Sequence, residues 1–140
     1  MAEEQTPQIP QNEAELGEWV RAQFQKANKH LAENGVMFES VVVEESRYMA
    51  PYLAVWKIKS NQGKFFWVMS GDLPSDYVPA NVASDVQGVL KHFALAWQLK
   101  AENLAANNPT EQTDIEYIQL LAHRAEGLYA MSEDEKLWQN

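Results

Sequence analysis

The feature that most constrains this chain is a short polar turn between two runs of strand-forming residues. Residues 60–63 read Ser-Asn-Gln-Gly, and glycine most easily adopts the left-handed backbone of a tight hairpin loop. The flanking residues 53–59 and 64–70 are rich in β-branched and aromatic side chains. This pattern predicts an antiparallel hairpin, so we expect the fold to contain a sheet.

Alternation along residues 53–59 indicates how that sheet is buried. Ala54, Trp56 and Ile58 share one face, whereas the other face carries two apolar residues followed by two lysines, namely Leu53, Val55, Lys57 and Lys59. This arrangement predicts one buried face and one partly wet face, with helices covering one side of the sheet. Trp56 and Trp67 are equally far from the loop, which predicts that they are cross-strand neighbours.

A third strand and a long first helix precede the hairpin. Residues 36–47 are rich in β-branched and aromatic residues, which predicts a strand. Over residues 13–34, apolar side chains recur every three or four positions, which predicts a helix. Asn12 can cap the start of this helix, and Gly35 is a strong signal for its end.

Two further helices are predicted after the strands. The second covers residues 82–106, and its apolar stretch is typical of a central helix packed on the sheet and on a neighbouring helix. The third covers residues 112–130, and the capping-box spacing of Ser132 and Glu135 predicts one more short helical turn. Residues 71–79 contain two prolines and a glycine, so regular structure is not expected across them.

The predicted fold class is α+β, with a three-stranded antiparallel meander and helices packed on one face. The element order is α-β-β-β-α-α. Residues 1–11 are polar and contain two prolines, so they are predicted to form a flexible tail. Residues 12–140 are predicted to form a single α+β domain, since a chain of 140 residues fits one domain.

Charge and composition narrow the choice of partners and compartment. The net charge is −9, which disfavours nucleic acid and anionic membrane surfaces and is compatible with a basic protein partner. The chain has no cysteine, which excludes disulfides and zinc–thiolate sites. No segment approaches the length of a membrane span, and the first dozen residues are not typical of a signal peptide. A cytoplasmic protein is therefore expected.

Five short segments carry a resemblance, namely residues 18–21, 44–48, 67–74, 92–93 and 97–98, and their most specific piece is Ser-Gly-Asp-Leu-Pro at 70–74. These segments resemble a small family of proteins from gamma-proteobacteria that is catalogued as a domain of unknown function. The resemblance covers about residues 19–104. It implies a bacterial, cytosolic, uncharacterised protein, and it transfers no catalytic residue.

The loop over residues 71–77 is the leading candidate for a ligand site. Functional residues often lie on loops held by a rigid scaffold. Asp72 and Asp76 could accept hydrogen bonds from a ligand, and Tyr77 could stack on it. The alternative is ordinary turn chemistry, in which Asp72 bonds nearby backbone N–H groups and Pro74 fixes the turn.

Three more residues complete the predicted site. Arg47 ends the first strand, close to Glu44 and Glu45 in the chain. One of these carboxylates could form an acid–base pair with Asp72 if the two loops converge. The alternative is that Arg47 closes the sheet end in an ion pair. His92 is expected at the rim of the apolar face of the second helix, where it could act as a base or be structural. Trp97 could line an aromatic pocket with other aromatic side chains or belong to the core.

No cofactor or metal is predicted. His123 and Glu126 have the i,i+3 spacing of metal ligands, but a real site needs more ligands than one such pair. The sequence has no dinucleotide-binding glycine pattern, no phosphate-binding loop and no nucleophile elbow, which lowers the expectation of an enzyme.

Two hypotheses of function follow from the sequence. The first is a non-enzymatic protein-binding or adaptor module whose partner is a basic protein or a second copy of the chain, since a three-stranded sheet has two open edges. The second is a small-molecule-binding protein or enzyme with a site near residues 71–77. A secretion-type chaperone is a weaker third alternative, suggested by small size and acidity.

Overall fold

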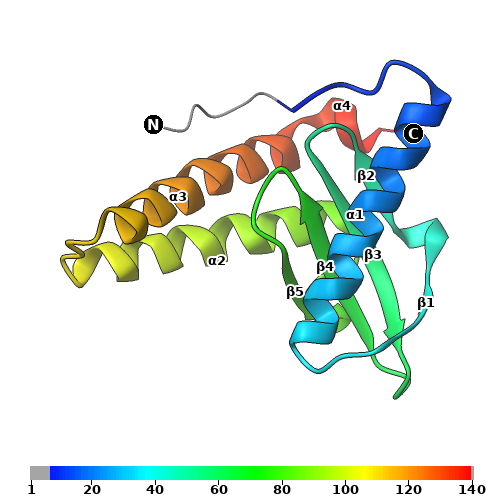
Figure 1. The fold of residues 1–140 in the computed structure, drawn as a ribbon, viewed down its shortest axis with the longest axis horizontal. Coiled ribbons are helices and arrows are strands. Elements are labelled where there is room, and N and C mark those ends of the chain that lie inside the picture. Colours follow the sequence, from blue (N-terminus) through cyan, green and yellow to red (C-terminus); the bar gives the residue numbers. More distant parts are fainter. Residues whose placement is uncertain (1–6, 140) are drawn as a thin grey trace. The chain divides into compact units, whose positions relative to one another are not determined.

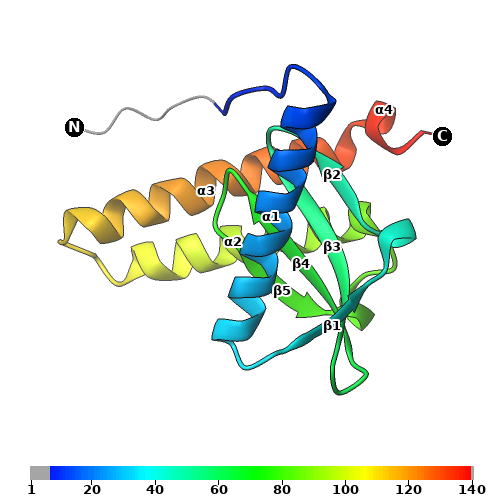
Figure 2. The same cartoon turned by 45° about the vertical axis from the view of Figure 1, so that its right-hand side comes forward.

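The computed structural model describes residues 7–139. The chain divides into two compact units, one up to Asn81 and one from Val82 onward. The first unit holds one helix and a sheet, and the second holds a helical hairpin (Figures 1 and 2). Residues 7–11 have no regular structure, and the remainder of the predicted tail lies outside the described residues. The prediction of a single domain over residues 12–140 stays a prediction.

Helix α1 (Glu13–Glu33) begins and ends where the sequence predicts. The side chain of Asn12 accepts a hydrogen bond from the backbone N–H of Glu15 at 2.9 Å. At the other end, Gly35 has a φ of +81°, and the N–H of Val36 donates to the carbonyl of Leu31 at 2.9 Å. These contacts satisfy backbone groups that a helix end would otherwise leave without partners.

The sheet has five antiparallel strands, so the prediction of a three-stranded meander is wrong in its count. Two short strands, β1 and β2, both pair with β3, which pairs with β4, which pairs with β5. The helices and the antiparallel sheet of the predicted α+β class are confirmed. The elements of this region are β1 (Phe38–Val41), the 3₁₀ turn η1 (Val43–Glu45), β2 (Arg47–Met49), β3 (Leu53–Ser60), β4 (Phe65–Gly71) and β5 (Asp76–Pro79).

The predicted strand over residues 36–47 is split in two by η1. At this break the chain leaves the hydrogen-bonded ladder with β3, and the side chain of Ser46 provides a partner for the backbone of β3 there. Its hydroxyl accepts from the N–H of Lys57 at 2.9 Å and donates to the carbonyl of Val42 at 2.8 Å. The side chain thus takes the place of a missing ladder contact. A further register shift, a bulge, lies between Phe38 and Ser40.

Strand β5 was not expected, because residues 71–79 contain two prolines. Pro79 is the last residue of β5, and β5 is the outermost strand on its side of the sheet. A proline is tolerated at such a position because an edge strand has one side on which its N–H groups need no partner. The prediction of no regular structure across residues 71–79 therefore holds only for residues 72–75, because Gly71 is the last residue of β4.

The predicted pairing of Trp56 with Trp67 is wrong by one residue. Trp56 lies opposite Val68, and Trp67 lies opposite Lys57. The turn is closed by a hydrogen bond from the N–H of Ser60 to the carbonyl of Lys64 at 2.8 Å, so its centre is Gln62. A shift of one residue moves a side chain to the other face of a sheet, so the two tryptophans lie on opposite faces.

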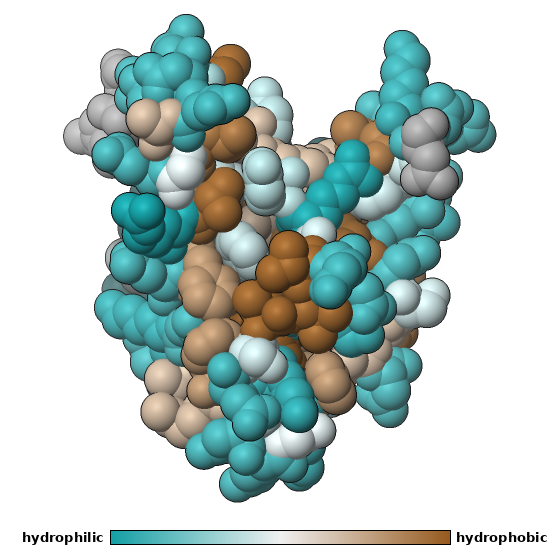
Figure 3. All heavy atoms as spheres, turned by 90° about the vertical axis from the view of Figure 1, so that its right-hand side faces the viewer, coloured by the Kyte–Doolittle hydropathy of each residue, from teal (hydrophilic) through white to brown (hydrophobic). Residues whose placement is uncertain are grey.

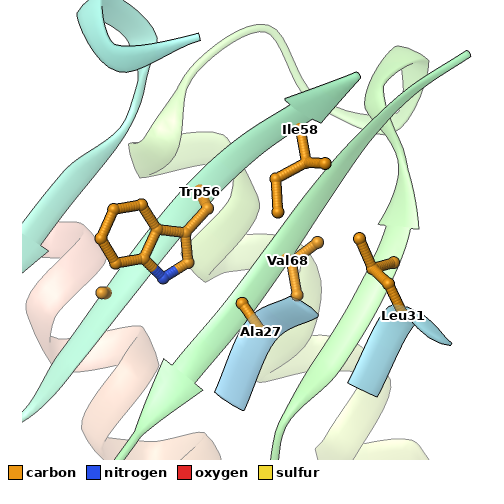
Figure 4. Packing of buried hydrophobic residues seen from close by; sticks show 6 residues of the cluster. Ala27, Leu31, Trp56, Ile58 and Val68 are labelled. Carbon is orange, nitrogen blue, oxygen red and sulfur yellow. The ribbon is translucent and has the colours of Figure 1, made fainter. Parts of the chain in front are cut away.

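Helix α1 covers one face of the sheet, and the core of the first unit lies between them. Figure 4 shows Ala27 and Leu31 of α1 next to Trp56, Ile58 and Val68 of strands β3 and β4. These five residues are buried. The face predicted from the alternation of Ala54, Trp56 and Ile58 is therefore the face under α1.

The second unit is built on two long helices that lie side by side and run in opposite directions (Figures 1 and 2). They are α2 (Val86–Ala106) and α3 (Gln112–Glu133), and they are followed by the short α4 (Glu135–Trp138). The residues that they bury are mainly large and apolar, namely Val86, Val89, Leu90, Phe93, Trp97, Leu121 and Leu128. The prediction that the second helix also packs on the sheet stays a prediction.

Two predicted details of these helices are wrong. Helix α2 begins four residues later than expected because the carboxylate of Asp85 accepts from the N–H of Gly88 at 2.8 Å and caps it there. The last helix is capped by Asp134, whose side chain accepts from the N–H of Lys136 at 3.1 Å. Ser132 lies inside α3, buried, and donates to the carbonyl of Tyr129. A side chain used within a helix in this way does not cap the next one.

Candidate functional site

Arg47 and Asp76 lie in one row across the sheet but at opposite edges. The row runs from Arg47 of β2 through Val55 and Met69 to Asp76 of β5. Three strand spacings separate the ends, which is about 14 Å between backbones. Val55 and Met69, which lie between them, are fully buried. The row is therefore occupied by packed side chains and leaves no open space between the two charged residues.

Tyr77 lies on the opposite face of the sheet from Asp76. It pairs with Val68, and its ring is 5.6 Å from the ring of His30 on α1 and 5.9 Å from that of Phe66. Because β5 is a strand, its successive side chains point to opposite faces. Tyr77 therefore packs on the core under α1, and the structure separates it from the carboxylate beside it in the sequence.

Asp72 directly follows β4 and is exposed. Its backbone N–H donates to the carbonyl of Tyr52 at 2.9 Å, which ties the loop to the turn between β2 and β3. The carboxylate of Asp76 accepts from the backbone N–H of Tyr77 at 2.8 Å. Neither contact is a hydrogen bond from a backbone N–H to the Asp72 side chain, so turn chemistry as the alternative to a ligand site stays a prediction.

His92 and Trp97 both lie on α2, in the second unit. Trp97 is almost completely buried, and its ring is 5.9 Å from that of Phe93. His92 is half-buried, with its ring 5.6 Å from the ring of Phe93. Trp97 therefore belongs to the helical core. The ligand-binding role proposed for the six residues Arg47, Asp72, Asp76, Tyr77, His92 and Trp97 stays a prediction.

The acidic residues before Arg47 are held differently from the expected arrangement. Glu44 and Glu45 lie in the turn η1 and not in the strand predicted over residues 36–47. Glu45 forms an ion pair with Lys57 at 3.1 Å, and the nitrogen of Lys57 also lies 5.3 Å from the ring centroid of Trp67. Lys57 is thereby fixed at the sheet surface by a carboxylate and an aromatic face.

Metal and membrane features were searched within residues 7–139. That part of the chain contains no group of three or more histidine, aspartate or glutamate side chains placed to hold a metal ion. Over the same residues, every helix is too short or too polar to cross a bilayer.

The Ser-Gly-Asp-Leu-Pro segment has a clear structural role. Ser70 is fully buried, and its hydroxyl accepts from Nε1 of Trp56 at 3.2 Å and donates to the carbonyl of Gln23 at 2.9 Å. This chain of hydrogen bonds joins β3, β4 and α1. Gly71, the next residue, has a φ of +139° and passes close to the backbone of Tyr52. The segment therefore fixes the end of β4 against its neighbours.

We expect Ser70→Ala to lower the free energy of unfolding by about 1 to 3 kcal/mol, because it leaves the buried N–H of Trp56 without a partner. The double variant Trp56→Phe, Ser70→Ala should cost less than the sum of the single variants, since both partners are then removed. Urea denaturation of the four proteins, followed by circular dichroism, measures this coupling. Strict additivity would show that the hydrogen bond contributes nothing.

Exposed and half-buried aromatic and apolar side chains lie along one edge of the first unit, and sequence reasoning missed them. The ring centroids of Trp19 on α1 and Tyr48 on β2 are 6.4 Å apart, with their planes inclined at 60°. Val43 in η1 and Tyr52 in the turn between β2 and β3 are also exposed. The residues come from four separate segments, so no local pattern in the sequence indicates that they share a surface.

The fold and this surface define a small α+β protein in which a helix packs on an antiparallel sheet, with a helical hairpin following in the sequence. The chain belongs to the family described as Domain of unknown function (DUF4826), whose model matches residues 13–138. No curated protein and no solved structure matches the chain. The predicted membership of a family of unknown function is confirmed; the gamma-proteobacterial origin and the importance of the Ser-Gly-Asp-Leu-Pro motif stay predictions.

Proposed function

We propose that this protein is a non-enzymatic protein-binding module of the bacterial cytoplasm that presents the β1–η1–β2 edge to its partner. The carrying observation is the exposure of large apolar and aromatic side chains along this edge. Val43 is 70% exposed, Tyr52 53% and Tyr48 46%, and Met37 and Phe38 are exposed as well. Single exposed hydrophobic residues are common, but several within one stretch are typical of an interaction site.

Figure 3 looks at the side of the molecule on which β1 and η1 lie and shows hydrophobic side chains gathered near the centre of that side. Tyrosine and tryptophan are favoured in interfaces because they bury a large area and keep a polar group for hydrogen bonding. Tyr48 and Tyr52 therefore suit the centre of a contact surface. The net charge of −9 favours a basic protein as the partner over nucleic acid or a membrane surface.

The test is capture of partners on the immobilised protein and on two charge variants. Val43→Glu places a carboxylate on the proposed edge, where its desolvation opposes binding, so the captured partner should be lost. Leu95→Glu is the matched control, because Leu95 is 62% exposed on α2 and belongs to the other compact unit of the chain.

The result expected is a stoichiometric partner that is retained by Leu95→Glu and lost from Val43→Glu. A partner that tolerates Val43→Glu would overturn the proposed surface. A second copy of this chain as the captured partner would mean that the edge is a homodimer interface, which sedimentation of the purified protein would show directly.

A further inference from the structure

We propose that the edge surface takes an arginine side chain of a basic partner protein between the rings of Trp19 and Tyr48. This inference rests on the proposed function and names the chemistry of its partner. The two rings stand 6.4 Å apart at an angle of 60°. Two aromatic faces inclined in this way form the sides of a wedge, and the face of an aromatic ring attracts a cation.

Both rings are held in place by the core of the first unit. Trp19 is half-buried and packs against the cluster formed by α1 and the sheet. Tyr48 pairs with Ala54, which is fully buried in the same cluster, while the tyrosine itself is 46% exposed. The wedge is therefore positioned by a helix and a strand, and little side-chain freedom is lost when a ligand enters.

Acidic residues lie close to both rings in the chain, and the carboxylate of one of them, Glu15, also accepts from the backbone N–H of Gln11 at 2.6 Å. Glu15 precedes Trp19 by one helical turn and so lies on the same side of α1, where it is exposed. Glu18 and Glu44 are exposed, and within residues 7–139 no ion pair engages either of them. Arg47 precedes Tyr48 in the strand, so its side chain belongs to the opposite face of the sheet.

This combination selects arginine among the side chains that could enter. An apolar side chain would gain only the area that it buries, and an acidic one would meet carboxylates of the same charge. A guanidinium is planar, so it can stack on one ring while its N–H groups reach a carboxylate such as that of Glu15. The occupant is thus an arginine on an exposed segment of a basic protein.

The probe is the capped peptide Gly-Gly-Arg-Gly-Gly, compared with the same peptide carrying citrulline, which keeps the shape of arginine and lacks its charge. Both are titrated into the ¹⁵N-labelled full chain and followed by NMR. The indole N–H of Trp19 and the amide of Tyr48 should shift with the arginine peptide. The buried indole of Trp56, which donates to Ser70, is the internal reference and should not move.

Variants separate the wedge from general attraction to an acidic protein. Tyr48→Leu should weaken binding about fivefold or more, because one aromatic face is removed. Tyr129→Leu is the matched control, because Tyr129 is 53% exposed on α3. This variant should bind the arginine peptide with the same affinity as the native chain. Raising the salt concentration should weaken binding of the arginine peptide.

The inference is overturned if the citrulline peptide shifts Trp19 as much as the arginine peptide does, or if Tyr48→Leu binds like the native chain. It is also overturned if about 20 mM arginine peptide leaves Trp19 unmoved, since a cation bound by both rings would populate the site at that concentration. The proposed function would survive such a result if the captured partner were still lost from Val43→Glu. Failure of both experiments would remove the function and the inference together.

Discussion

Replacing Gly71 with alanine is expected to lower the free energy of unfolding by about 2 to 6 kcal/mol. Two causes act together. The φ of +139° lies in a region that residues with a Cβ rarely adopt. An added Cβ would also lie 2.5 Å from the carbonyl oxygen of Tyr52 and 2.6 Å from the Cα of Leu53. Both neighbours are backbone atoms of the paired segment, so neither can move aside cheaply.

Gly63→Ala and Gly17→Ala are the matched controls. Gly63 has a φ of +77° with open space around it, so alanine there should cost only the strain of the backbone, about 1 to 2 kcal/mol. Gly17 lies within α1 with open space, and alanine should stabilise the protein by about 0.5 to 1 kcal/mol. Urea denaturation measures all three. If Gly71→Ala costs no more than Gly63→Ala, then the close approach to Tyr52 is not present in the protein.

Leu31→Ala is expected to lower the free energy of unfolding by about 2 to 5 kcal/mol, because it opens a cavity in a core that cannot fully collapse. Leu31 is fully buried between α1 and the sheet (Figure 4). Its backbone carbonyl also accepts from Val36 at the helix end, so the residue holds α1 in place through both its side chain and its backbone. Thermal and urea unfolding of the purified variant give the loss.

Leu95→Ala deletes the same atoms from an exposed site and should change the stability by less than about 0.5 kcal/mol. Equal losses for the two variants would contradict the burial of Leu31 under α1. A large loss for Leu95→Ala alone would mean that the outer face of α2 is covered in solution.

Local chemistry was enough to predict the signals at the two ends of α1. Asn12 and Gly35 act through contacts with residues three or four positions away, and such contacts can be inferred from the order of residues alone. Asp85 acts in the same way but was missed, because the run of residues before it has an apolar pattern that extends the expected helix. The start of α2 is thus set by the Asp85 cap and not by the first apolar residue of that run.

Contacts between distant residues account for the errors in the sheet. The break between β1 and β2 depends on the hydroxyl of Ser46 reaching the N–H of Lys57, which is eleven positions away. Strand β5 depends on the free edge of β4 as its partner rather than on its own propensity. The register error at Trp67 arose because the loop closes at Lys64, which composition does not specify.

The grouping of the candidate site residues also depends on distant contacts, and their ligand-binding role stays a prediction. Asp76 and Tyr77 were expected to be neighbours in a loop. They lie in strand β5, so their side chains point to opposite faces of the sheet. Trp19 and Tyr48 are separated by most of α1 and by β1, so their proximity depends on how the helix lies on the sheet. Single residues can be nominated from the sequence, whereas their grouping is decided by the tertiary fold.

The split strand at the edge of the first unit has a consequence for how the protein behaves at high concentration. A continuous outer strand is a template on which a second chain can add its own strand, which is how many sheets aggregate. Here the outer strand consists of four residues and three residues, separated by the η1 turn and kinked by a bulge near Phe38. Such an edge offers no long backbone ladder, so its hydrophobic side chains can remain on the surface for recognition without inviting fibrous self-assembly.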